Sequence, residues 1–166
     1  LEQTLAFLAN QADSEQRLKD LKRQLNDAPR LINEAQREFT RLKASAVKPV
    51  SERYGKSSAV QLESLLSERT SQLSGWQQEL AEANSLLITA QTRPERAQAE
   101  ISSNQTRALK INNMLKVGKD AGKPISPEQR DQLNAELAAL NAVTELRRQE
   151  LAGNSLLQDL GSSRRD

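Results

Sequence analysis

A repeating pattern of hydrophobic residues runs through the middle of the chain and predicts one long helix packed against others. One series recurs every seven residues, at Leu66, Leu73, Leu80, Leu87, Pro94, Ile101, Ala108 and Leu115. A second series lies four residues before each of these, at Leu62, Arg69, Trp76, Ala83, Ala90, Ala97, Asn104 and Ile111. Alternating steps of four and three are typical of a helix face that packs against neighbouring helices. We call the two series together the heptad seam, and a continuous helix over this run would be about 80 Å long.

Two further stretches carry apolar residues at helical spacing. We expect a first helix over about residues 2–46, where the apolar residues continue to Ala46. The helix that carries the heptad seam is expected over about 58–115. A third helix is predicted over 127–152, followed by a suggested short helix over 155–162, because Gly153 and Asn154 can end or kink a helix.

Capping signals support the starts of the second and third helices. Ser58 with Gln61, and Ser126 with Gln129, have the spacing of a capping box, in which each residue bonds to the backbone of the other. The connectors between the helices, 47–57 and 116–126, contain glycines and prolines that oppose helix formation.

Two prolines interrupt the predicted helices and leave a choice between a kink and a hairpin. Pro29 lies inside the first helical pattern and Pro94 occupies a position of the heptad seam. Thr92 and Glu95 could form a capping box, which would favour a new helix start at this point. The apolar phase nevertheless continues across both prolines, which favours a kink over a hairpin.

These patterns predict an all-α fold, an elongated antiparallel helical bundle or coiled coil of about three long helices, kinked near Pro29 and Pro94, in a single domain over 1–166. Composition supports thin helix packing over a compact globular core. Aromatic residues make up only 2% of the chain and the mean hydropathy is −0.72. The apolar supply is chiefly Leu and Ala, which suits helices that each bury one narrow stripe.

Three residues of the heptad seam are candidates for setting helix register or partner choice. Arg69 and Asn104 place polar side chains where apolar ones are expected, and a polar seam residue can fix register at a cost in stability. The alternative is that both simply face solvent. Trp76 is the one large ring on the seam and is expected to be a buried anchor.

The sequence offers no residues for catalysis, a cofactor or a metal. It contains neither His nor Cys, so the usual nucleophile–base pairs and soft metal sites are excluded. Gly55-Lys56-Ser57 resembles the end of a phosphate-binding loop, but the earlier glycine that such a loop requires is replaced by Val50. We therefore predict that the protein is not an enzyme.

Charge gives little support to nucleic-acid binding. The net charge is +2, and acids and bases alternate along the helices as on solvated helix faces. A basic cluster near the second connector consists of Arg107, Lys110, Lys116, Lys119 and Lys123. No aromatic residue lies among them for base stacking, and Asp120 reduces the positive charge, so no nucleic acid is expected. Binding of this cluster to an anionic lipid surface has the same electrostatic support as binding of a nucleic acid.

Two stretches carry a resemblance to a known family. The first is residues 91–98, QTRPERAQ, and the second is Leu140-Asn141-Ala142 followed by residues 151–159, LAGNSLLQD. Both resemble the N-terminal periplasmic helical region of the large, potassium-regulated mechanosensitive channels of the KefA type, and Ala28-Pro29 is similar too. The resemblance implies a fragment of a larger inner-membrane protein, with membrane contact and pore residues in segments outside this sequence. It also implies a homo-oligomer, so that other subunits of the same channel are the expected partners.

The leading hypothesis is therefore an extracytoplasmic helical domain of a mechanosensitive channel, on the periplasmic side of a bacterial inner membrane. Its role would be structural or regulatory, with contacts to neighbouring subunits and envelope components. The alternative is a free-standing coiled-coil scaffold or adaptor, which would explain the periodicities equally well. The two differ in the flanking sequence, because only a channel requires membrane spans.

Overall fold

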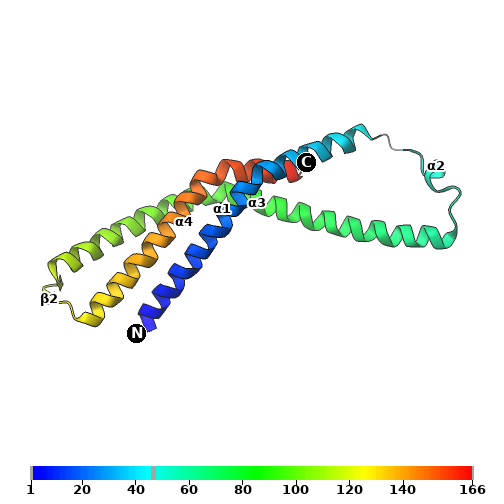
Figure 1. Ribbon diagram of the computed structural model, residues 1–166. Helices are drawn as coiled ribbons and strands as arrows, with labels where there is room; N and C mark the ends of the chain where they lie inside the picture. The colour runs from blue at the N-terminus through cyan, green and yellow to red at the C-terminus, as the bar shows by residue number, and fades with distance from the viewer. Residues whose placement is uncertain (1, 46–47, 166) are drawn as a thin grey trace. The chain divides into compact units, whose positions relative to one another are not determined.

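The computed structural model describes residues 2–45 and 48–165, and nearly all of them are helical (Figure 1). The elements in chain order are α1 (Glu2–Ala44), α2 (Val50–Tyr54), α3 (Ala59–Val117), β1 (Lys119–Asp120), β2 (Lys123–Pro124) and α4 (Pro127–Arg165). The all-α helical prediction is confirmed. The predicted end of the first helix, at about Ala46, lies outside the described residues.

Both predicted capping boxes are formed, and they place the starts of α3 and α4. The backbone N–H of Ser58 donates to Gln61 Oε1 at 2.9 Å, and the N–H of Gln61 donates to Ser58 Oγ at 3.3 Å. Ser126 and Gln129 make the same reciprocal pair, at 3.0 and 3.2 Å. Each box satisfies backbone donors that a helix start would otherwise leave without a partner.

The chain continues as helix through both prolines. Pro29 lies inside α1, and Pro94 lies inside α3. A hairpin at either proline is therefore excluded, and the capping box that Thr92 and Glu95 could form does not start a helix. The helices continue because the apolar face keeps one phase across each proline, so packing of that face outweighs the lost hydrogen bond.

One expected helix end is wrong, because α4 continues through Gly153 and Asn154 to Arg165. The reason lies in packing against α1. A methyl group at Gly153 would come within 2.5 Å of the Leu25 side chain. The glycine thus permits close approach of two helices, and it does not act as a helix terminator.

The two connectors contain short elements that the sequence pattern did not predict. Residues of the first connector form the five-residue helix α2. In the second, β1 and β2 pair in an antiparallel hairpin in which Lys119 faces Pro124. Gly118 and Gly122 adopt φ of +69° and +84°, where residues with a side chain are strained, so these glycines allow the chain to reverse between α3 and α4.

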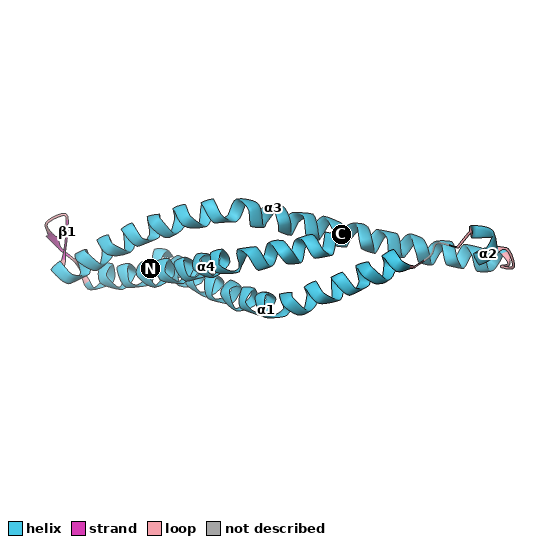
Figure 2. Ribbon diagram, turned by 90° about the horizontal axis from the view of Figure 1, so that it is seen from above, coloured by secondary structure: helices cyan, strands magenta, loops and turns pink. Residues whose placement is uncertain are grey.

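The chain packs as two compact units. The first consists of Leu1–Asp27 with Ala90–Ser155, and the second of Ala28–Thr89 with Leu156–Asp166. In the first unit, segments of α1, α3 and α4 lie side by side (Figures 1 and 2). The Gln132 amide of α4 donates to Gln3 Oε1 of α1 at 2.6 Å. Because Leu25 of α1 meets Gly153 farther along α4, these two helices run parallel.

Helix α4 runs antiparallel to α3 within the same unit. Arg107 bonds to Glu136, and Arg93 lies 4.0 Å from Glu150, so residue numbers fall along α3 as they rise along α4. The core that these helices share is narrow. Its fully or nearly fully buried members on α3 include Ala90, Ala97 and Ile111, and the small alanines allow helix backbones to approach closely.

In the second unit the end of α4 packs on α3. Leu157 and Leu160 are fully buried, and a methyl group at Gly161 would come within 2.9 Å of the Leu87 side chain. The Ala83 carbonyl oxygen lies 3.4 Å from the same point. Gly161 is thus a second position at which the absence of a side chain permits close packing of α4 on its neighbour.

Candidate interaction surface

The heptad seam of α3 divides into two parts with different environments. We call the part from Ala83 to Ile111 the covered seam, since Ala83, Ala90, Ala97, Ile101 and Ile111 are all buried in it. We call the part from Leu62 to Leu80 the open seam. Its apolar members all keep much of their surface exposed, at 41% for Leu62, 68% for Leu66, 52% for Leu73, 61% for Trp76 and 44% for Leu80.

The expectation that Trp76 is a buried anchor is therefore wrong. Within the described residues of the second unit, Gly161 of α4 packs against Leu87 and Ala83 of α3. Trp76 lies about two helical turns nearer the start of α3, where α4 does not reach. The heptad pattern correctly marks the face that can pack, but it does not say that a partner is present.

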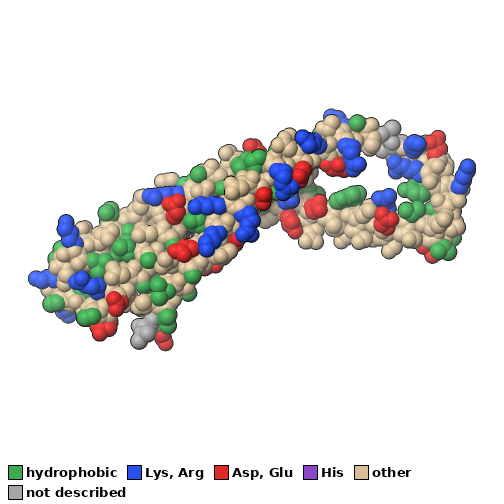
Figure 3. All heavy atoms as spheres, in the orientation of Figure 1, with side chains coloured by type: hydrophobic (Ala, Val, Ile, Leu, Met, Phe, Trp, Pro, Cys, Tyr) green, Lys and Arg blue, Asp and Glu red, His purple; other side chains and the backbone are tan. Residues whose placement is uncertain are grey.

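The open seam lies on the part of α3 from Ala59 to Thr89, which we call the α3 arm. The part of α1 in the same unit, Ala28–Ala44, is the α1 arm. Figure 3 shows open space between these two arms, with apolar side chains on the side of the α3 arm that borders it. Phe39 and Leu42, on the α1 arm, are exposed as well. A shallow groove beside the open seam is lined by Glu63, Leu66, Ser67, Thr70, Ser71 and Ser74. Exposed apolar side chains that line one helix face, as those of the open seam do, are typical of an interaction site.

Arg69 is the one charged residue of the open seam. Its side chain is exposed and its guanidinium donates to Gln72 Oε1 on the same helix at 2.6 Å. In the structure Arg69 is therefore exposed to solvent, which was the alternative to a role in setting register. A helix laid on the open seam would cover this charge and would need to supply an acceptor for it.

Asn104 lies in the covered seam, and its amide nitrogen Nδ2 is buried without a hydrogen-bond partner among the described residues. The cross-helix pairs of Arg107 and Arg147 place Asn104 opposite residues 139–143 of α4. Its unpaired Nδ2 costs stability, because a buried donor without a partner loses its bond to water.

Cross-helix ion pairs flank the covered seam. The Arg107 guanidinium on α3 donates to both carboxylate oxygens of Glu136 on α4, at 2.6 and 2.8 Å. These hydrogen bonds raise the pKa of Arg107 above its ordinary value. A two-point bond of this kind fixes orientation as well as distance, so it holds α3 and α4 in one register.

A second group of charges lies farther along the same flank. Arg147 on α4 bonds to Glu100 of α3 at 2.6 Å and to Glu150 of its own helix at 2.9 Å. Arg93 of α3 lies 4.0 Å from Glu150. Burial lowers the pKa of Arg147, but the hydrogen bonds to the two carboxylates outweigh it, and the net shift is upward. Two cations and two anions thus balance in a partly buried cluster.

The ion pairs were not predicted, although the sequence holds their signal. Arg93, Glu100 and Arg107 are spaced by seven residues, each directly before a member of the heptad seam. Positions beside a seam are where cross-helix ion pairs form. The alternation of charges along one helix does not by itself show that these residues have partners on another helix.

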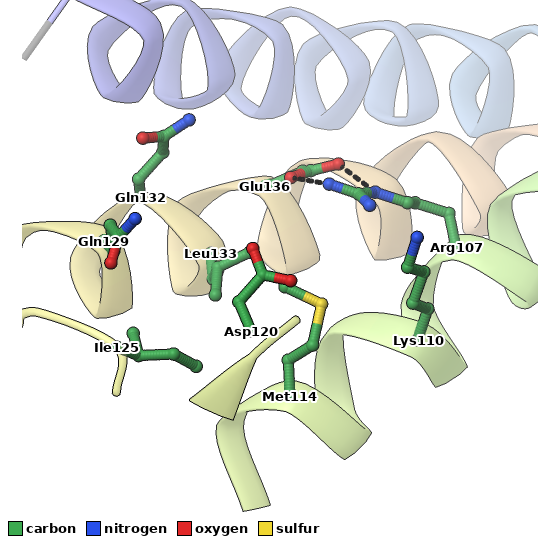
Figure 4. Close-up of a pocket in the computed structure, with 9 residues that line it drawn as sticks. All are labelled: Arg107, Lys110, Met114, Asp120, Ile125, Gln129, Gln132, Leu133 and Glu136. Carbon is green, nitrogen blue, oxygen red and sulfur yellow. Dashed lines mark hydrogen bonds and ion pairs between the residues drawn. The ribbon is translucent and has the colours of Figure 1, made fainter. Parts of the chain in front are cut away.

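The basic cluster predicted near the second connector is partly neutralised by its surroundings. Arg107 is occupied by Glu136, and Asp120 lines the same cavity as Lys110 (Figure 4). This cavity, of about 220 Å³, lies in the first unit beside the β-hairpin, with the apolar side chains of Met114, Ile125 and Leu133 in its wall. Its mixture of both charges favours a local structural role over binding of a polyanion.

The described residues also contain no group of His, Cys, Asp or Glu arranged to hold a metal ion. Among the helices of this part of the chain, none is both long enough and apolar enough to cross a membrane.

Comparison with known proteins agrees with the resemblance noted in the sequence. Residues 1–166 match the family described as the mechanosensitive ion channel porin domain. Over 107 residues the chain is 35% identical to the mechanosensitive channel MscK of Escherichia coli (strain K12). The matched segment covers 64% of this chain but only 10% of MscK, so the chain spans about a tenth of that relative's length. No solved structure matches significantly. The resemblance to the periplasmic region of KefA-type channels is therefore confirmed.

Proposed function

Because the chain belongs to the mechanosensitive ion channel porin domain family, we propose that it is a structural and regulatory domain of a mechanosensitive channel, placed on the periplasmic side of the bacterial inner membrane. The observation that carries this proposal is the family match over the whole chain. The match favours a channel over a free-standing scaffold or adaptor. The family is one of channel domains and not of enzymes.

The geometry supports a mechanical role for the domain. Three long helices contribute to the first unit, and the ion pairs of Arg107 and Arg147 lock α3 against α4. A set of helices with fixed register transmits displacement from one end to the other, because the helices cannot slide without breaking these pairs. We propose that the domain acts as a spacer that biases gating, and that it contributes no pore residues. Its partners would be other subunits of the channel and components of the envelope.

The regulatory role can be tested in the full-length channel by weakening the register lock. Glu136→Ala and Glu100→Ala would leave two arginines without their cross-helix partners. We expect the membrane tension needed for opening to shift, while single-channel conductance stays unchanged. An altered conductance would show that the domain contributes to the pore, and an unchanged tension threshold would contradict the regulatory role. Glu38→Ala, which removes an exposed pair with Arg41 on α1, is the matched control.

Placement on the periplasmic side has a separate test. The chain contains no Cys, so a single Ser64→Cys substitution on an exposed position of α3 gives one reactive thiol in this domain. A maleimide that crosses only the outer membrane should label it in intact cells. Labelling that requires lysis of the inner membrane would contradict the periplasmic placement.

Asn104 is proposed as the register position of the covered seam. Replacement by Leu removes the unpaired Nδ2 and should raise the free energy of unfolding by roughly 1 kcal/mol or more. We expect the same substitution to permit alternative registers of α4 on α3, as when a polar seam residue is lost from a coiled coil. Pairs of cysteines placed across α3 and α4 would report this as a wider set of disulfides. If the variant keeps a single set, Asn104 does not determine the register.

A further inference from the structure

The open seam continues, without a change of phase, the helix face that α4 covers farther along α3. Its residues from Leu62 to Leu80 follow the same alternation of four and three as the covered seam. Leu66, Leu73 and Trp76 are more than half exposed. A face with this spacing is shaped to receive one helix, because the side chains of a second helix fit between residues at these intervals.

The covering helix in the buried part of the seam is α4, and its last contacts indicate what would cover the rest. Leu157 and Leu160 are fully buried, and Gly161 lies against Leu87 and Ala83. Helix α4 runs antiparallel to α3 and remains one helix to Arg165. Each further residue of an extended α4 would therefore advance one position along α3 toward its start.

We propose that the open seam is covered by the segment that follows Asp166 in the full-length protein, as a helical continuation of α4. From the contact at Gly161, such a continuation would reach Trp76 within about five residues of Asp166 and Leu62 within about twenty. The related channel MscK is about ten times longer than the segment that this chain matches, so a relative of this domain does occur within a much longer chain. The proposal concerns folding of the domain and does not depend on its role in gating.

The chemistry of the covering segment follows from the surface that it meets. It should carry apolar residues in alternating steps of three and four, opposite the exposed leucines and Trp76. Arg69 lies between Leu66 and Leu73 and has only Gln72 as an acceptor in the described residues. The segment should therefore place an acidic residue about eleven positions after Asp166, where it can pair with this guanidinium.

The first test measures thiol reactivity in the full-length protein, with any cysteines outside this chain replaced by serine. Leu66→Cys and Leu73→Cys place a thiol on the open seam, and Ser64→Cys places one on an exposed face of the same arm. We expect a small polar maleimide to react with the two seam thiols at least tenfold more slowly than with the control. Equal rates would overturn the proposal.

The second test identifies the occupant by disulfide formation. Leu73→Cys is paired in turn with a cysteine at each of the first twenty positions after Asp166. We expect intramolecular disulfides that recur every three or four positions and are strongest about seven residues after Asp166. A pattern without periodicity would overturn the proposal. So would disulfide-linked dimers through Leu73→Cys, which indicate a second copy, or preferential linkage to Phe39→Cys, which indicates that the α1 arm closes over the seam.

Discussion

In the covered seam of α3, Ala90 and Ile111 have no exposed surface, whereas in the open seam Leu66 and Trp76 keep most of theirs. Both stretches lie on one face of one helix and follow the same spacing. They differ in the presence of α4 and in the residues at their edges. The flank of the covered seam carries Arg93, Glu100 and Arg107, while the corresponding positions of the open seam are Leu65, Gln72 and Glu79. The apolar spacing thus marks a packing face, and among the flanking charges named here only those beside the covered seam pair with another helix in the described residues.

The largest difference between the two stretches should appear when a large apolar side chain is truncated. In a protein of residues 1–166, Ile111→Ala removes a fully buried side chain and should lower the free energy of unfolding by about 2–5 kcal/mol. Leu66→Ala in the open seam should change it by no more than about 0.5 kcal/mol. Urea unfolding followed by circular dichroism measures both. Equal losses would remove the distinction between the two stretches.

A smaller effect, of opposite sign in the two regions, is expected for glycine replacement. Gly153→Ala would force a methyl group against the end of the Leu25 side chain. The overpacking should cost about 1–3 kcal/mol and the alanine should regain about 1 kcal/mol of helix propensity, so we expect a net loss of up to about 2 kcal/mol. Gly75, beside Trp76 in α3, has no atom within 4 Å of the added methyl group. Gly75→Ala should therefore stabilise the helix, by up to about 1 kcal/mol. Thermal unfolding would show a lower midpoint for the first variant and a higher one for the second.

A third comparison sets a cross-helix ion pair against an exposed one. A double-mutant cycle on Arg107 and Glu136 should give a coupling energy of about 1 kcal/mol, because this pair is partly buried and joins two helices. The same cycle on Arg41 and Glu38, an exposed pair one turn apart on α1, should give a smaller coupling energy, because solvent screens it. Raising the salt concentration should weaken the second coupling more than the first. A cross-helix coupling no larger than the exposed one would contradict the register lock.

The smallest effect concerns pH and the starts of α3 and α4. A hydrogen bond with its own backbone, and a further one with Ser126, lower the pKa of Glu128 in the first turn of α4. A lowered pKa means stability that is present above the ordinary carboxyl pKa and is lost as pH falls through the folded value. Helix α3 has no acidic residue in its first turn. Amide exchange should therefore accelerate at the start of α4 on acidification, and Glu128→Gln should abolish this change.

The fold could be predicted from the sequence where local rules act alone. Ser58 with Gln61 located the start of α3, because capping depends only on residues one turn apart. The continuity of α1 and α3 through Pro29 and Pro94 followed from the apolar phase. The exposure of Trp76 could not be predicted, since burial depends on how far a separate helix reaches. The passage of α4 through Gly153 was missed for a related reason: only a neighbour such as Leu25 shows whether a glycine ends a helix or permits contact.

The prolines inside the two longest helices have a mechanical consequence. Pro29 and Pro94 have no N–H to donate to the carbonyls of Leu25 and Ala90, one turn earlier. A helix resists bending through its ladder of backbone hydrogen bonds, so each rod has a local minimum of flexural stiffness at its proline. Under a transverse load, curvature would concentrate at these two positions while the segments on either side stay straight. The backbone is therefore most compliant to bending at Pro29 in α1 and at Pro94 in α3.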